Sequence, residues 1–199
     1  MANPQRNLLI DADRLWSTLM RSAEIGTGLS GGLRRLALTD SDKEMRNQYV
    51  AWCEAIGCTV TVDATGSIFA RRAGRENDLP PVLVGSHLDS QAAGGRFDGI
   101  LGVLSGLEIL RTLEDNGITT RRPIEVVNWT NEEGARFAPP MAASCVFAGL
   151  QTIEWLHNLK DDDGIRFGDE LKRIGYLGDA PVGGRDLDSY FELHIEQDS

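Results

Sequence analysis

Positive charge is scarce in this 199-residue chain, which has 20 Lys and Arg residues against 30 Asp and Glu residues. The net charge of -10 leaves no basic footprint for nucleic acid or anionic lipid, so neither is expected as a partner. No stretch approaches the ~18 apolar residues of a membrane span. Asp11 and Asp13 interrupt the short apolar stretch at the N-terminus, which therefore lacks the core of a signal peptide.

Cysteine is also rare, and its pattern excludes two common uses. Cys53, Cys58 and Cys145 are odd in number and form no CxxC pair, so the sequence predicts neither a disulfide framework nor a zinc knuckle. We therefore expect a soluble, cytoplasmic protein. The 41% of hydrophobic and 25% of charged residues are typical of a globular chain with one sizeable core.

The first part of the chain is predicted to form two helices and a hairpin. Helical spacing of apolar residues predicts a helix over residues 11–23. Ser41 and Glu44 have the spacing of a capping box, which predicts the start of a second helix there. Two β-branched stretches, 59–63 and 67–71, flank a short glycine-containing turn, and this pattern predicts a hairpin.

The rest of the chain indicates the fold class. An apolar strand over 82–85 leads to a helix over about 100–116, and a second buried strand follows at 124–129. This βαβ order predicts an α/β fold with a mostly parallel central sheet and helices on both faces. A further helix is expected over 167–174, and alternating residues predict a half-buried strand over 191–196.

Polar residues suited to metals stand at the ends of the predicted strands. His87 lies in GSHLDS, Asp98 in GGRFDGI, Glu132 and Glu133 in NWTNEEGARF, and His194 in ELHIEQ. Ligands of parallel sheets bind outside the carboxyl ends of the strands, so these side chains are expected to share one cleft. Imidazole and carboxylate suit zinc, manganese, cobalt or nickel. The predicted metal ligands are His87, Asp98, Glu133 and His194.

Two more acids have predicted roles beside these ligands. Asp89 follows His87 by two residues, so its carboxylate could accept the second N–H of the imidazole and select the tautomer. Glu132 is adjacent to Glu133, so one carboxylate can bind a metal while its neighbour takes a proton from water. This pairing predicts Glu132 as the general base.

Each of these features also has a structural interpretation. A lone histidine at a strand end is commonly a hydrogen-bonded structural residue, and adjacent glutamates are commonly a solvated surface. Asp98 alone could cap the following helix. The Gly94-Gly95 pair could be a plain turn, and it lacks the GK[ST] ending of a phosphate-binding loop. His157, on a predicted helix, is interpreted as structural.

Three long strings, GSHLDSQAAGGRFDGILGVL, NEEGARFAPPMAASCVFAG and ELHIEQ, occur in order along the chain. They resemble the M20 metallopeptidase superfamily in its amidase, hydantoinase and carbamoylase branch, and most closely the N-carbamoyl-L-amino acid hydrolases. The resemblance covers nearly the whole chain. It implies a zinc-peptidase-like catalytic domain that binds two divalent metal ions, which could be Zn, Mn, Co or Ni.

The resemblance also implies a role for each matched residue. His87 and His194 would either share one metal or bind one each, with Asp98 bridging and Glu133 completing the second site. Glu132 carries over as the catalytic base. The remaining transfers are Asp89, which would orient His87, and Gln197, which would lie near the substrate.

The implied reaction is hydrolysis of an N-carbamoyl-L-amino acid to the amino acid, ammonia and carbon dioxide. Allantoate amidohydrolase and β-ureidopropionase activities are close alternatives, and an aminoacylase or peptidase is a more distant one. Full-length family members are longer homodimers, with a lid and dimerisation domain and a further histidine ligand. Residues 1–199 are therefore expected to be the N-terminal part of a truncated catalytic domain. A catalytically inactive fragment with a structural or regulatory role is the alternative from another class.

Overall fold

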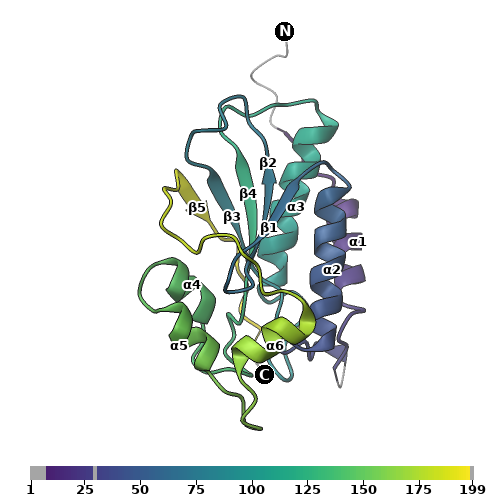
Figure 1. Cartoon of the computed structure of the whole chain (residues 1–199). Helices are drawn as coiled ribbons and strands as arrows, with labels where there is room; N and C mark the ends of the chain where they lie inside the picture. Colours follow the sequence, from purple (N-terminus) through teal and green to yellow (C-terminus); the bar gives the residue numbers. More distant parts are fainter. Residues whose placement is uncertain (1–7, 29–30, 198–199) are drawn as a thin grey trace.

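The structure is a computed structural model that describes residues 8–28 and 31–197 (Figure 1). Helices and strands alternate only in the middle of the chain, from β3 to α4. The helices are α1 (Ala12–Ser22), α2 (Asp40–Glu54), α3 (Ile100–Asp115), α4 (Ala142–Phe147), α5 (Ile153–Asn158) and α6 (Phe167–Ile174). The strands are β1 (Thr59–Val62), β2 (Ile68–Arg72), β3 (Val82–His87), β4 (Ile124–Trp129) and β5 (Ser189–Phe191).

The strands form one sheet in the order β1-β2-β4-β3-β5. β3 runs parallel to β4, as the βαβ pattern predicts, and it also runs parallel to β5. The β1–β2 hairpin joins β4 in the antiparallel direction, so the complete sheet is mixed. The predicted α/β class is confirmed, and the predicted parallel arrangement applies to the three strands that surround the polar motifs.

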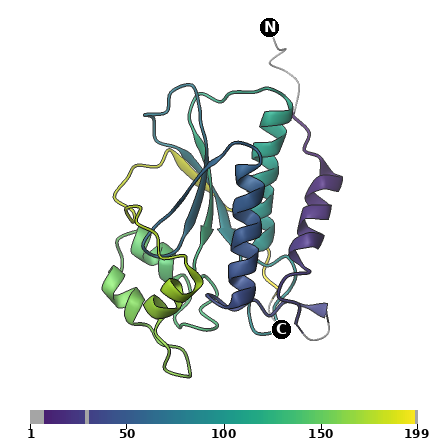
Figure 2. The same cartoon turned by 45° about the vertical axis from the view of Figure 1, so that its right-hand side comes forward.

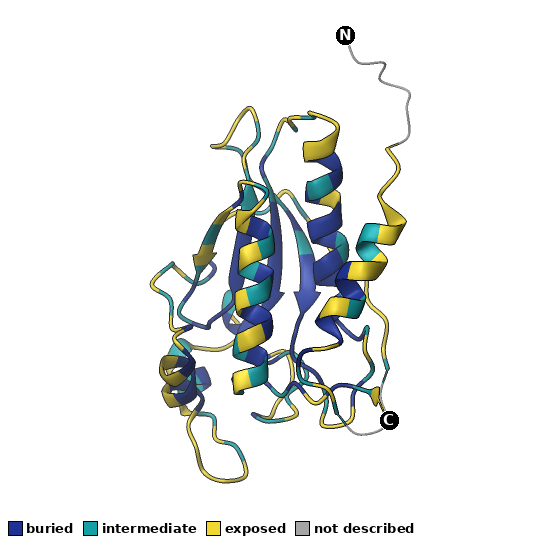
Figure 3. Ribbon diagram, turned by 90° about the vertical axis from the view of Figure 1, so that its right-hand side faces the viewer, coloured by how far each residue is buried: buried dark blue, intermediate teal, exposed yellow. Residues whose placement is uncertain are grey.

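Helices α1, α2 and α3 lie on one side of the sheet (Figures 1 and 2). The long helix α3 packs on β3 and β4, and α1 packs on α3. Their inward faces are buried while their outward faces are exposed, as Figure 3 shows. Leu104, Leu107 and Val126 are fully buried in the core between these layers. Each such side chain contributes about 1.5–3 kcal/mol by leaving water.

The opposite face of the sheet has a smaller apolar cluster. Its buried members come from three strands and are Phe69, Leu83, Val127 and Trp129. Phe147 at the end of α4 and Leu187 before β5 pack against it. Helices therefore flank the sheet, and the second face is covered partly by α4 and partly by the segment that leads into β5.

The capping residue predicted for α2 is wrong. Thr39, and not Ser41, is the N-cap, because its side chain accepts a hydrogen bond from the backbone N–H of Asp42. Ser41 lies within the first turn, where its hydroxyl is 3.0 Å from the Thr39 hydroxyl. Thr39 and Ser41 are both suitable N-cap residues by type, and the extended backbone conformation of Thr39 identifies it as the cap.

The strand predicted over 191–196 is also wrong, because β5 ends at Phe191. Phe191, Leu193 and Ile195 are 60%, 54% and 42% exposed. The chain leaves the sheet and crosses over the start of α3. There the Leu193 carbonyl oxygen lies 2.5 Å from where a Cβ on Gly102 would stand. Alternation of apolar and polar residues therefore does not show whether a segment pairs with a neighbouring strand.

Among the described residues, no helix combines the length and apolarity that crossing a membrane requires. Cys53 and Cys58 are buried and Cys145 is partly exposed, and all three are free thiols. These free thiols agree with the prediction that the three cysteines form no disulfide framework.

Candidate metal centre

Three segments bring polar side chains together at the carboxyl end of β3. His87 is the last residue of β3, Asp98 stands two residues before α3, and His194 lies three residues beyond β5. One ligand atom from each lies within 4.8 Å of the other two. We call His87, Asp98 and His194 the His–Asp cluster.

The distances within the His–Asp cluster suit a single cation. The two Nε2 atoms of His87 and His194 are 3.2 Å apart. Oδ1 of Asp98 is 3.6 Å from His194 Nε2 and 3.9 Å from His87 Nε2. Tetrahedral zinc bonds of about 2.1 Å would separate neighbouring ligand atoms by about 3.4 Å. The side chains therefore already stand close to ligand spacing.

Backbone contacts determine which nitrogen of His87 faces the cluster. Nδ1 is 2.9 Å from the backbone carbonyl oxygen of Asp89. A carbonyl oxygen only accepts hydrogen bonds, so Nδ1 carries the proton and the neutral ring presents the lone pair of Nε2 to the cluster. This is the tautomer that a metal ligand needs.

The Asp89 carboxylate does not orient His87 as predicted. Its Oδ1 is 4.0 Å from His87 Nδ1, while the backbone carbonyl of the same residue accepts the hydrogen bond. The two carboxylate oxygens instead accept hydrogen bonds from the backbone N–H groups of Glu132 and Glu133, at 3.3 and 3.4 Å. Asp89 thus connects the end of β3 to the loop that carries both glutamates.

The adjacent glutamates point to different partners. Oε2 of Glu132 lies 3.4 Å from His87 Nε2, beside the His–Asp cluster. Oε2 of Glu133 instead accepts a hydrogen bond of 2.5 Å from the side-chain amide of Gln91. Glu133 is therefore next to the cluster without belonging to it, whereas Glu132 faces it directly.

Burial of so many acids raises their pKa values. Burial raises the pKa of Glu133 to about 8, and the charges of Asp89 and Asp98 add to the rise. Burial likewise raises the pKa of Asp89 to about 7 and moves the pKa of Glu132 upward. The pKa of His87 is lowered, chiefly by burial. A divalent cation would reverse these shifts, because it favours ionised carboxylates and neutral imidazole.

Two buried oxygens add to the evidence for a cation. Asp98 Oδ1 and Glu133 Oε1 are among several buried carboxylate oxygens of the described residues that accept no hydrogen bond. An isolated buried carboxylate oxygen is costly unless a donor or a metal satisfies it. Asp98 does not cap α3 either, since the N-cap is Gly99 with no side-chain bond. The donor set, its spacing and these oxygens fit a divalent metal ion.

Some residues of the site were not identified from the sequence. A Cβ on Gly99 would lie 2.1 Å from His87 Nε2, so only glycine allows the ring to pack here. Gln91 holds Glu133, as described above. The glycines of this loop indicated a turn, but no sequence signal showed which side chain they accommodate.

Gln197 lies against the loop that precedes α3. Its backbone N–H donates to Asp98 Oδ2 at 2.8 Å, and its side-chain oxygen accepts from the backbone N–H of Phe97 at 2.9 Å. Gln197 therefore holds Asp98 directly. His157 lies elsewhere, where its Nε2 donates to the Ala64 carbonyl oxygen at 2.8 Å, in keeping with its structural interpretation.

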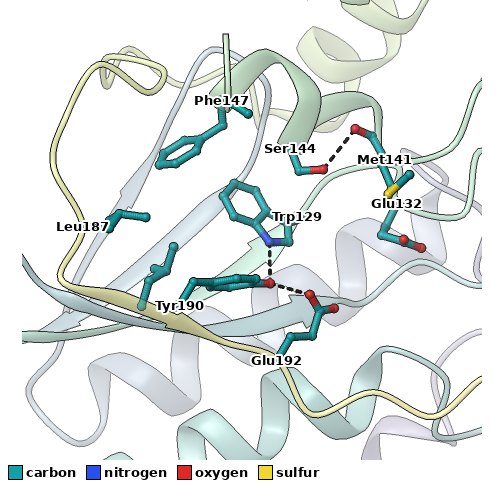
Figure 4. A pocket seen from close by; sticks show the side chains of 10 residues that line it. Trp129, Glu132, Met141, Ser144, Phe147, Leu187, Tyr190 and Glu192 are labelled. Atoms are coloured by element: carbon teal, nitrogen blue, oxygen red, sulfur yellow. Dashed lines mark hydrogen bonds between the residues drawn. The ribbon is translucent and has the colours of Figure 1, made fainter. Parts of the chain in front are cut away.

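A cavity of about 300 Å³ opens beside Glu132 (Figure 4). Trp129, Phe147 and Tyr190 form an aromatic wall, and Glu132 and Glu192 supply carboxylates at its edge. A concave, mostly apolar space with a few polar groups is typical of sites for small organic molecules.

Fold and site together define an α/β protein with a histidine and carboxylate centre at the carboxyl end of a parallel strand pair. The model of peptidase family M20/M25/M40 matches residues 83–199. The chain belongs to this family, whose members are generally metal dependent.

Relatives identify the branch of the family that this chain resembles. It is 56% identical over 197 residues to an N-carbamoyl-L-amino-acid amidohydrolase of Rhizobium meliloti, covering 99% of this chain and 47% of the relative. It is 31% identical over 207 residues to a ureidoglycolate hydrolase of Arabidopsis thaliana, covering 98% and 43%. A solved amidase of the hydantoinase/carbamoylase family from Burkholderia multivorans matches with a TM-score of 0.93 and 59% identity, covering 94% and 46%. The chain thus spans less than half the length of these relatives.

Proposed function

We propose that this chain carries the metal-binding part of a hydrolase of linear C–N bonds, with an N-carbamoyl-L-amino acid as substrate. The products would be the amino acid, ammonia and carbon dioxide. The observation that supports hydrolysis most directly is the Glu132 carboxylate 3.4 Å from His87 Nε2, at the edge of the His–Asp cluster. The similarity to the Rhizobium meliloti amidohydrolase supports the substrate class.

We assign the His–Asp cluster to one divalent cation and Glu133, together with Asp98, to a second. Zinc, manganese, cobalt and nickel all accept imidazole and carboxylate ligands. When bound, such ions polarise the scissile carbonyl and lower the pKa of water toward ~7. The buried oxygens Asp98 Oδ1 and Glu133 Oε1 are the atoms that this assignment uses.

The protein's own groups would then move the proton and position the reactants. Glu132 accepts a proton from the attacking water and delivers it to the leaving nitrogen. The Asp89 carboxylate accepts a hydrogen bond from the backbone N–H of Glu132 and so holds Glu132 beside the His–Asp cluster. Gln197 would contact the substrate through its side-chain amide while its backbone holds Asp98. The cavity beside Glu132 would accept the side chain of the amino acid.

We further propose that residues 1–199 correspond to the N-terminal part of the relatives' catalytic domain. A lid and dimerisation domain and a further metal ligand would belong to the remaining length of those relatives, which form homodimers in this proposal. Hydrolysis by the 199-residue chain alone is then expected at or near background. A fragment that folds but has only a structural or regulatory role is the competing possibility.

The similarity to a ureidoglycolate hydrolase favours one alternative substrate class. Ureidoglycolate and N-carbamoyl amino acids share a ureido group, so the same centre could act on either. Allantoate and N-carbamoyl-β-alanine also carry ureido groups and are close alternatives, whereas an aminoacylase or peptidase substrate is a more distant one.

An ammonia-release assay tests the proposal. The chain is completed to the relatives' length with the matching segment of the Rhizobium meliloti protein, loaded with Zn²⁺, Mn²⁺ or Co²⁺, and given each ureido substrate. N-carbamoyl-L-amino acids should be hydrolysed fastest. Glu132→Gln should abolish turnover and keep the metal, whereas Glu133→Gln should lose metal. Equal loss of metal in both variants would contradict the assignment of base and ligand.

A further inference from the structure

The segment from Glu192 to Gln197 carries His194, yet no strand partner holds it. β5 ends at Phe191, and the segment continues across the start of α3. Besides one backbone hydrogen bond, from the N–H of Gly95 to the Gln197 carbonyl oxygen at 3.2 Å, side-chain contacts hold this segment. These side-chain contacts lie at its two ends.

Gln197 makes the contact at the far end, through the Asp98 carboxylate and the Phe97 N–H described above. The near end depends on Glu192. Its Oε1 accepts a hydrogen bond of 2.6 Å from the hydroxyl of Ser86, and its Oε2 accepts one of 2.6 Å from the hydroxyl of Tyr190. We call this arrangement the Glu192 anchor.

The Glu192 anchor is built so that both hydroxyl groups donate to it. The indole N–H of Trp129 donates to the Tyr190 oxygen at 3.0 Å, as Figure 4 shows. An indole N–H cannot accept, so the single phenolic proton of Tyr190 is directed to Glu192. Ser86 is fully buried, which limits the orientations of its hydroxyl. Hydrogen bonds to an ionised acceptor are the stronger kind.

The anchor joins the neighbours of two metal-binding residues. Ser86 immediately precedes His87, and Glu192 stands two residues before His194. Only Leu193 separates Glu192 from His194, so fixing the Glu192 side chain also limits where the His194 side chain can lie. Gly102 allows the segment to approach α3, because a Cβ there would lie 2.5 Å from the Leu193 carbonyl oxygen.

We propose that Glu192 is a positioning residue, whose carboxylate, held by Ser86 and Tyr190, places the His194 imidazole opposite His87 at the spacing that a divalent cation needs. The inference rests on the metal site of the proposed function. It concerns the affinity of that site for a metal and requires no turnover.

Cobalt titration of the chelator-stripped 199-residue protein tests the anchor, with the visible absorption of Co²⁺ as the readout of coordination. Glu192→Gln and Ser86→Ala should each weaken Co²⁺ binding about 10–100-fold, the range seen when partners of metal ligands are removed. The double variant should be little weaker than either single variant, because Glu192→Gln leaves one acceptor oxygen for two hydroxyl donors and so already breaks the anchor that Ser86→Ala breaks. Glu154→Gln, an equal charge change at an exposed position of α5, should bind like the wild type.

Other outcomes would overturn the inference. If Glu192→Gln weakens binding while Ser86→Ala does not, charge alone explains the effect. Equal falls in the melting temperature of the stripped and loaded variants would indicate a merely structural role. Tyr190→Phe, which removes the other hydroxyl, replaces Ser86→Ala should that variant fail to fold. If the His87→Ala variant binds Co²⁺ as tightly as the wild type, the metal site itself is refuted. This outcome differs from a failure of the Glu192 anchor, in which His87→Ala still weakens binding.

Discussion

Gly99→Ala tests the close packing of the metal centre against the start of α3. Gly99 has a φ of +66°, and an added Cβ would lie 2.1, 2.2 and 2.3 Å from three ring atoms of His87. Non-bonded carbons normally stay about 3.5–4.0 Å apart. The ring would therefore have to retreat by roughly 1.5 Å, although it is fully buried.

The cost has two separable parts. A left-handed backbone costs an alanine about 1–2 kcal/mol. Overpacking against a buried ring adds about 1–3 kcal/mol. Gly117→Ala is the matched control, because Gly117 has a φ of +62° and nothing lies within 4 Å of an added Cβ. At about 2–4 °C per kcal/mol for a chain of this size, Gly99→Ala should melt about 2–12 °C below Gly117→Ala.

Thermal unfolding of the chelator-stripped proteins measures the stability difference, and Zn²⁺ titration then measures the site. Displacement of His87 should weaken Zn²⁺ binding by at least about tenfold in Gly99→Ala. Gly117→Ala should bind Zn²⁺ as the wild type does, since it is at the other end of α3. Equal stability and equal Zn²⁺ affinity in the two variants would refute the packing argument.

Three further outcomes are expected. Metal analysis after dialysis of the 199-residue chain should find one ion retained and a second lost, because the second site has fewer ligands; two tightly held ions would contradict this. The hydrogen bond from Arg173, helped by Arg136, lowers the pKa of Glu170. The stability that the ionised Glu170 carboxylate provides is therefore fully present above its unfolded pKa of about 4.3, and it is lost as the pH falls through the lower folded pKa. In chemical denaturation between about pH 5 and 3, the Glu170→Gln variant should therefore lose less stability than the wild type. Asp42→Asn should destabilise the fold by about 3–5 kcal/mol, because it leaves the fully buried Arg46 without its ion pair; a loss under 1 kcal/mol by urea denaturation would contradict this.

Local patterns predicted most of the elements that position the site. Helix α6 (Phe167–Ile174) and strand β4 (Ile124–Trp129) have the bounds that periodicity indicates. The reason is that both are short amphipathic or buried segments whose burial is decided by residues within a few positions. The choice of Thr39 over Ser41 depended on one backbone torsion and was not predictable in this way.

Only some of the contacts between distant segments could be predicted from the sequence. The strand-end rule placed His87 and Asp98 at one edge because parallel strands share that edge. The Glu192 anchor joins residues 106 positions apart, and no local pattern reports such a pair. Whether Asp89 offers its carboxylate or its carbonyl to His87 is decided by a side-chain rotamer, which the sequence does not reveal.

The separation of the two histidines has a consequence for folding. His87 and His194 are 107 residues apart, so a shared cation would close a loop of more than half the chain. By the loop-closure model, a cross-link across ~100 residues removes about 4.7 kcal/mol of chain entropy from the unfolded state. The ion would then act as a reversible staple, and the unfolding midpoint of the entire chain would rise and fall with the concentration of the metal.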